Sequence, residues 1–142
     1  MKDLSNVTLM AYTGLDEPDH IRKTLKSLQH SASQMKFGAV KMIAPVGNIN
    51  DNTIASNNTH IGGIILNHLV NYVELVDTKR VDNVGYSRFI VEELVNHIDT
   101  EYCIGLQWDS SIINANLWED GFLKFDYIGA PWPNVPHYVN RV

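Results

Sequence analysis

Apolar residues occur along this chain in runs of strand length, and each run ends at a polar or chain-breaking position. The apolar runs cover residues 7–12, 37–44 and 102–106, and a fourth segment, 72–76, alternates as a strand does and is followed by Asp77. Continuous apolar runs of this length are typical of strands that are buried on both faces of a parallel sheet. We therefore expect these four segments to form the strands of one sheet.

Between these runs, apolar residues recur every three or four positions, which predicts helices. Ile21, Leu25 and Leu28 show this spacing after Asp19, whose carboxylate we expect to cap the first turn. A second helix is expected over residues 86–99. Because strands and helices alternate, the predicted fold is α/β, a parallel-dominated open sheet with helices on both faces.

Two further segments do not follow these patterns. Residues 47–59 are rich in Asn, Asp, Ser and Thr and predict an irregular loop. Residues 61–71 are ambiguous between helix and strand. With 142 residues the chain is expected to form a single α/β domain over residues 1–142.

Composition narrows the possible function classes. The net charge is −5 and the basic residues are scattered, so a nucleic-acid partner is not expected. No apolar run approaches the roughly 20 residues that span a bilayer. The start of the chain lacks the apolar stretch of a secretory signal, and the single cysteine, Cys103, lies in a strand pattern where we expect it to be buried. A cytoplasmic location fits these features best.

Polar side chains follow the first and last predicted strands. Ala11, Tyr12 and Thr13 end the first strand, and Gln107 and Asp109 follow the last one. In open α/β sheets, ligands bind beyond the carboxyl ends of the strands, so these positions are candidate ligand contacts and the two strands are expected to be near neighbours. Tyr12 and Thr13 could equally close a turn, Gln107 could bond to backbone, and Asp109 could cap the next segment.

The C-terminal third is rich in aromatic residues. Density of this kind usually indicates a packed wall, so core packing is expected, with Trp132 partly exposed between two prolines. Trp108 is expected to point away from its two polar neighbours and to pack against the protein. The cluster comprises Trp118, Phe122, Phe125, Tyr127 and Trp132.

Two motifs stand in this part of the chain: Gln107-x-Asp109, and the run from Phe122-Leu123 to Asp126-Tyr127-Ile128-Gly129-Ala130-Pro131-Trp132. With these motifs the chain resembles a family of glycosyltransferase-like proteins from bacteria and viruses. The match is strongest after residue 86 and departs from the family pattern at two positions. Ser110 stands where the family usually has glycine, and Phe125 where it has tyrosine.

This resemblance implies the nucleotide-sugar-binding half of the GT-A glycosyltransferase fold, as the donor-binding part of a longer enzyme. Such an enzyme transfers a sugar from a nucleotide diphosphate donor to an acceptor, here an unknown glycan or other molecule. The resemblance implies a divalent cation, Mn²⁺ or Mg²⁺, held by Asp109. It further implies donor contacts from Ala11, Tyr12, Thr13, Asp77, Arg88, Gln107 and Trp132.

Two alternatives to these roles stay open. Arg88 could pair with Glu92 one helical turn later instead of binding diphosphate, and Asp77 could be a solvated acid at a strand end. The domain as a whole could be a catalytically silent binding or interaction module, because a fold does not by itself imply a function.

Overall fold

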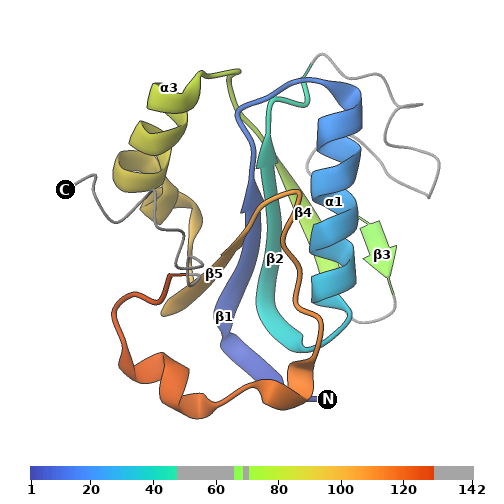
Figure 1. The fold of residues 1–142 in the computed structure, drawn as a ribbon, viewed down its shortest axis with the longest axis vertical. Coiled ribbons are helices and arrows are strands. Elements are labelled where there is room, and N and C mark those ends of the chain that lie inside the picture. The colour runs from blue at the N-terminus through green and yellow to red at the C-terminus, as the bar shows by residue number, and fades with distance from the viewer. Residues whose placement is uncertain (48–65, 69–70, 130–142) are drawn as a thin grey trace, which may run out of the picture.

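In the computed structural model, residues 1–47, 66–68 and 71–129 are described, and they form one five-stranded sheet (Figure 1). The strand order is β3-β4-β2-β1-β5; four strands are parallel, and β3 pairs antiparallel with β4. The expected parallel-dominated α/β sheet is therefore confirmed. The strands are β1 (Asp3–Tyr12), β2 (Lys36–Ala44), β3 (Leu66–His68), β4 (Asn71–Asp77) and β5 (Tyr102–Leu106).

All four predicted strands are present, and the ambiguous segment contributes the short edge strand β3. The expected loop over 47–59 lies almost wholly outside the described residues. The first and last predicted strands are direct neighbours, since Ala11 of β1 is in register with Leu106 of β5. The ends of these two strands therefore meet at one edge of the sheet.

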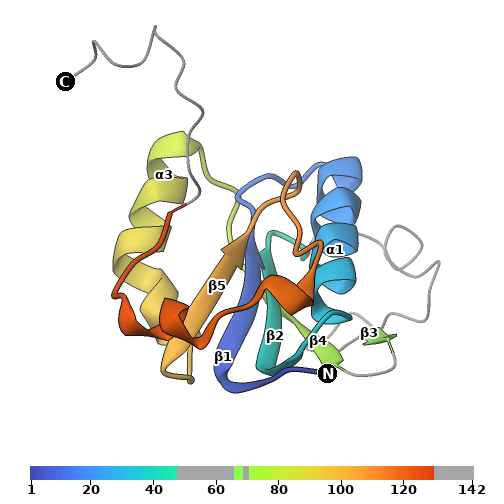
Figure 2. The ribbon, with the colours of Figure 1, turned by 60° about the horizontal axis from the view of Figure 1, so that its bottom comes forward.

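Helices cover both faces of the sheet (Figures 1 and 2). Helix α1 (Pro18–Ala32) packs on one face, where Ile21, Leu25 and Leu28 join the main core as their spacing predicts. Asp19 is not the N-cap: Glu17 occupies that position and Pro18 begins the helix. Proline favours the first helical position because its missing N–H would have no partner there.

The second predicted helix, over residues 86–99, was expected to be continuous, but the structure divides it into three parts. Helix α3 (Asn83–Arg88) passes into a π turn, η2 (Phe89–Glu93), and then into a 3₁₀ turn, η3 (Leu94–His97). A π turn shifts the register of a helix face. Even so, this helix packs on the sheet through a second core cluster, in which Phe89 is buried with Met10, Tyr12 and Ile43. The partly buried residues Tyr86, Leu94 and Ile98 pack against this cluster.

Two short 3₁₀ turns follow β5, η4 (Ala115–Leu117) and η5 (Asp120–Lys124). The predicted aromatic wall is wrong in part. Trp118 is half-buried against the main core, but Phe125 and Tyr127 are 62% and 85% exposed. Both residues follow the short turn η5 and lie outside any strand or regular helix that would direct their rings into the core. Trp132 lies outside the described residues.

Cys103 also differs from its expected position. It is exposed, because its strand β5 lies at the edge of the sheet and Cys103 is on the face opposite the main core. Within the part of the chain that the structure describes, no helix is both long and apolar enough to cross a membrane.

Candidate functional site

The order in which successive strands are added to the sheet reverses between β1 and β5. From β1 the chain passes through α1 to β2 on one side, whereas β5 lies on the other side of β1 and is reached through α3. The two connections, α1 and α3, therefore lie on opposite faces of the sheet, whereas the loops after β1 and β5 both pass onto the α1 face (Figure 2). In open α/β sheets such a switch point is where ligands bind.

The end of β1 is almost wholly enclosed. Ala11, Tyr12 and Thr13 are 0%, 2% and 4% exposed. The Thr13 amide donates to the Ile43 carbonyl at 3.0 Å, and the Thr13 hydroxyl accepts from the Leu15 amide at 3.1 Å. Thr13 thus closes the turn after β1. The predicted contact of these three residues with a donor stays a prediction.

Tyr12 lies in a column of rings on the α3 side of the sheet. Its ring stacks on Phe89 with centroids 4.1 Å apart and on Tyr86 at 4.8 Å, and Phe89 stacks on His97 at 5.6 Å. The Tyr12 hydroxyl is buried and has no hydrogen-bond partner among the described residues. Burial raises the pKa of Tyr12, and the nearby Tyr86 and Glu93 raise it further. A neutral, unpaired hydroxyl therefore lies close to the switch point.

The turn after β5 places Gln107 and Asp109 on the rim of the sheet. The backbone amide of Gln107 donates to the Ser110 hydroxyl at 2.7 Å, and the backbone amide of Ser110 donates to the backbone carbonyl of Gln107 at 3.1 Å. The Gln107 side chain donates to the Tyr86 hydroxyl at 3.0 Å and not to backbone. Ser110 thus supports the turn through both its hydroxyl and its backbone amide.

Helix α1 holds the same turn from the other side. The Ser27 hydroxyl donates to the Ser110 carbonyl, and the Ile112 amide donates to the Ser31 hydroxyl at 2.9 Å. Both serines are buried. The backbone that carries Asp109 is therefore fixed to the helix that covers the sheet.

Asp109 is exposed and its carboxylate has no ion pair among the described residues. No group of three acidic, histidine or cysteine side chains in the described ranges could hold a metal ion. A Mg²⁺ ion can be held by one or two carboxylates when substrate phosphates and water complete its ligands. Asp109 fits a cation that arrives with a phosphate ligand, and does not by itself form a metal cage.

Two other predicted donor contacts, Asp77 and Arg88, lie among the described residues. Asp77 ends β4, two strands from β1, and its carboxylate accepts from the amides of Val46 and Gly47 at 2.9 and 3.0 Å. Arg88 approaches Glu92 at 3.9 Å, as the alternative reading predicted. Asp77 thus holds the first residues after β2, at Val46 and Gly47, and Trp132 is outside the described residues.

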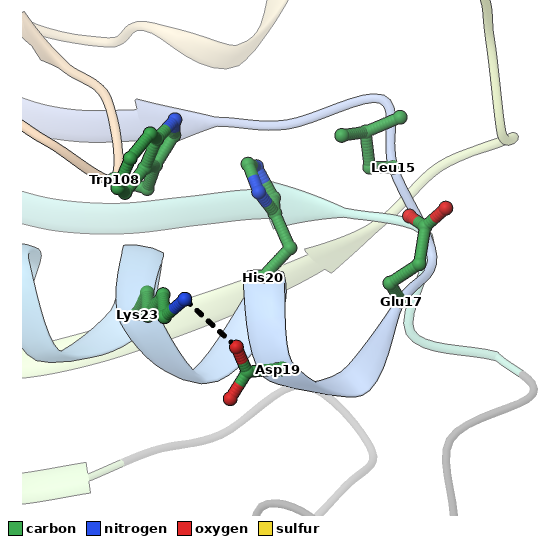
Figure 3. Close-up of a pocket in the computed structure, with 6 residues that line it drawn as sticks. All are labelled: Leu15, Glu17, Asp19, His20, Lys23 and Trp108. Atoms are coloured by element: carbon green, nitrogen blue, oxygen red, sulfur yellow. Dashed lines mark ion pairs between the residues drawn. The ribbon is translucent and has the colours of Figure 1, made fainter.

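Sequence reasoning missed a pocket of about 300 Å³ on the α1 side of the switch point (Figure 3). Trp108 does point away from Gln107, as expected, but it is 48% exposed and lines this pocket instead of packing inside the protein. The only signal in the sequence is its place at a strand end. The lining residues are Leu15, Glu17, Asp19, His20, Lys23 and Trp108.

The loop between β4 and α3 fixes the β1–α1 loop beside this pocket. Arg80 pairs with Asp16 at 2.9 Å and approaches Glu17 at 3.5 Å. The Val81 amide donates to the Gly14 carbonyl at 3.0 Å, and a Cβ on Gly14 would lie 2.4 Å from a Val81 methyl group. A side chain at position 14 would therefore require Val81 to move, and these contacts hold the loop that carries Leu15 and Glu17.

Comparison with known proteins identifies one family. The family described as "Protein of unknown function (DUF5672)" matches residues 71–141, which include β4, α3, β5 and the turn with Asp109. No curated protein and no solved structure matches the chain.

Proposed function

Because the chain belongs to the DUF5672 family, whose function is unknown, we propose its function from the switch point itself. The proposal is that this domain binds a nucleotide-sugar donor, as the donor-binding portion of a glycosyltransferase. The acceptor would be a glycan or another hydroxyl-bearing molecule. The catalytic step is left unassigned, since no described residue is placed against an acceptor.

The observation that carries this proposal is the adjacency of β1 and β5 at the point where strand order reverses. Register places Ala11 beside Leu106, so the β1–α1 loop and the turn with Gln107 and Asp109 begin side by side. A ligand in such a crevice meets groups from both loops. An exposed carboxylate without a partner in the described chain is then available at its rim.

The chemistry of sugar transfer suits an acid at this place. Departure of a nucleoside diphosphate leaves negative charge, which a divalent cation neutralises while it also orients the donor. Mn²⁺ and Mg²⁺ prefer oxygen ligands, and Asp109 would supply one of them. Gln107, whose amide donates to Tyr86, keeps its carbonyl oxygen for a ligand, because that donation uses only the nitrogen.

A catalytically silent binding domain is the second candidate. Its support is that Thr13, Asp77 and Arg88 all have partners within the protein. In that case the scaffold would bind a ligand or a protein without transferring a sugar.

Titration separates the two candidates. UDP and GDP are titrated into the chain with Mn²⁺ or with a chelator, and binding is followed by calorimetry and thermal melting. The proposal expects metal-dependent binding, and a ligand at a hundred times its Kd should stabilise the fold by about 2.7 kcal/mol. Absence of binding to both nucleotides, or equal binding with chelator, contradicts a metal-assisted donor site and favours the silent domain.

A further inference from the structure

We propose that the pocket beneath Trp108 binds the ring of a neutral sugar. The pocket lies on the α1 face, whereas the Gln107 side chain and Tyr12 lie on the α3 face. It is thus a separate subsite beside the proposed nucleotide position. The inference rests on the proposed function for the kind of ring expected, but it is tested separately.

The first argument is the exposure of Trp108. Trp108 is 48% exposed although α1 lies close by, and its ring interacts with His20 and Lys23 of that helix. The His20 ring centroid is 6.1 Å away at an angle of 57°, and the Lys23 ammonium group lies 5.9 Å from the ring centre. A half-exposed tryptophan beside a pocket is an apolar platform with one polar edge, which is typical of a binding site.

The second argument is the charge of the pocket. Each charged side chain that lines it already has an ion-pair partner. Asp19 pairs with Lys23 at 2.9 Å, and Glu17 approaches Arg80 at 3.5 Å. With the cationic and anionic groups paired to one another, the pocket has no excess positive charge to attract a phosphate. A neutral ligand is favoured.

The third argument is the mixture of donors and acceptors. Carboxylates at Glu17 and Asp19 accept hydrogen bonds, the Lys23 ammonium group donates them, and His20 can do either. A sugar hydroxyl both donates and accepts, so neighbouring hydroxyls can meet both kinds of group. The C–H face of a pyranose is apolar and can cover the Trp108 ring, with Leu15 at the far end of the pocket (Figure 3).

The experiment measures binding of methyl glycosides of glucose, galactose and N-acetylglucosamine to the 142-residue chain. Saturation-transfer NMR and chemical-shift titration report the bound face and the affinity. Uridine and guanosine are titrated in parallel. The variants are Trp108→Ala, Trp108→Phe and, as the matched control, Phe125→Ala, which removes an exposed ring outside the pocket.

We expect at least one glycoside to bind, and Trp108→Ala to weaken it about tenfold or more, because the stacking surface is lost. Trp108→Phe should restore part of the affinity, and Phe125→Ala should leave it unchanged. The inference is overturned if no glycoside binds, if Trp108→Ala binds as well as the parent, or if only nucleosides require Trp108. Circular dichroism confirms that each variant is folded.

The outcome is distinguishable from that of the nucleotide titration. Glycoside binding that depends on Trp108, without metal-dependent UDP or GDP binding, would retain the sugar pocket and reject the donor site. Metal-dependent nucleotide binding without glycoside binding would reject only the sugar pocket.

Discussion

The side-chain amide of Gln107 donates a 3.0 Å hydrogen bond to the hydroxyl of Tyr86. This bond joins the turn after β5 to helix α3. Because the Tyr86 ring also stacks on Tyr12 at the end of β1, one chain of contacts links β5, α3 and β1 across the switch point. The position of Gln107 is therefore set by the helix on the opposite face from α1.

A pair of tyrosine variants tests this chain of contacts. Tyr86→Phe should lower the free energy of unfolding by about 0.5–1.5 kcal/mol, because the Gln107 amide loses its acceptor. Tyr12→Phe should be neutral or stabilising, since the buried Tyr12 hydroxyl has no partner in the described chain. Urea unfolding of both variants measures the difference. A larger loss for Tyr12→Phe would show that its hydroxyl has a stabilising partner.

Asp109→Asn tests the proposed metal ligand. The substitution keeps the shape of the side chain but removes the charge that attracts a hard cation, so Mn²⁺-dependent binding of UDP or GDP should be lost. Asp109 is exposed and unpaired among the described residues, so the free energy of unfolding should change by no more than about 0.5 kcal/mol. Calorimetric titration and thermal melting check the two expectations. Unchanged nucleotide binding would remove Asp109 from the site.

Gly38→Ala should be strongly destabilising. A Cβ at Gly38 would lie 2.1 Å from the Ser5 carbonyl oxygen, beside the register shift between β1 and β2. Backbone must move to admit it, which should cost about 1–3 kcal/mol or more. Gly121→Ala is the matched control, because a Cβ there meets nothing within 4 Å. Chemical denaturation should separate the two, and equal stability would contradict the described strand register.

Trp118→Ala should cost about 1–3 kcal/mol, below the value for a fully buried ring, because Trp118 is only half-buried. The variant loses an edge-on contact with Phe122 at 5.3 Å and an indole hydrogen bond to Asp120 at 3.1 Å. Phe125→Ala, at an exposed ring, should change stability far less. Thermal melting compares them; similar melting temperatures would place Trp118 outside the core.

Cys103 should react slowly with thiol reagents. Although the residue is exposed, neighbouring atoms withhold water from its thiolate and raise its pKa from 9.0 to about 11. At pH 8 the thiolate fraction should be about 100-fold below that of a thiol with pKa 9.0. Alkylation rates of the folded and urea-unfolded chain measure this. Equal rates would contradict the raised pKa.

Because the pKa of Cys103 is raised in the folded chain, the free energy of unfolding should depend on pH. The unfolded chain releases the Cys103 proton at a lower pH than the folded chain, so it binds fewer protons between about pH 9 and pH 11. The free energy of unfolding should therefore fall as the pH rises through this range. Cys103→Ala should reduce that fall, and an identical slope in the variant would show that other groups cause it.

The strands were predictable because their information is local. Continuous apolar runs such as 7–12 leave few alternatives to a buried strand, and helical spacing of Ile21, Leu25 and Leu28 determines which face of α1 is buried. The polar groups at both strand ends led us to expect β1 and β5 to be near neighbours, and the structure pairs them directly. The strand and helix patterns themselves are set by neighbours within a few residues.

Only the tertiary structure decided which residues come together at the candidate site. Asp77 holds the first residues after β2, because chain folding brings the amides of Val46 and Gly47 to its carboxylate. Trp108 joins His20 in a pocket across 88 positions of sequence, a contact that no local spacing encodes. The sequence alone determined the sheet and which strand ends carry polar groups. Long-range packing determined which of those groups bind the protein itself and which stay open to a ligand.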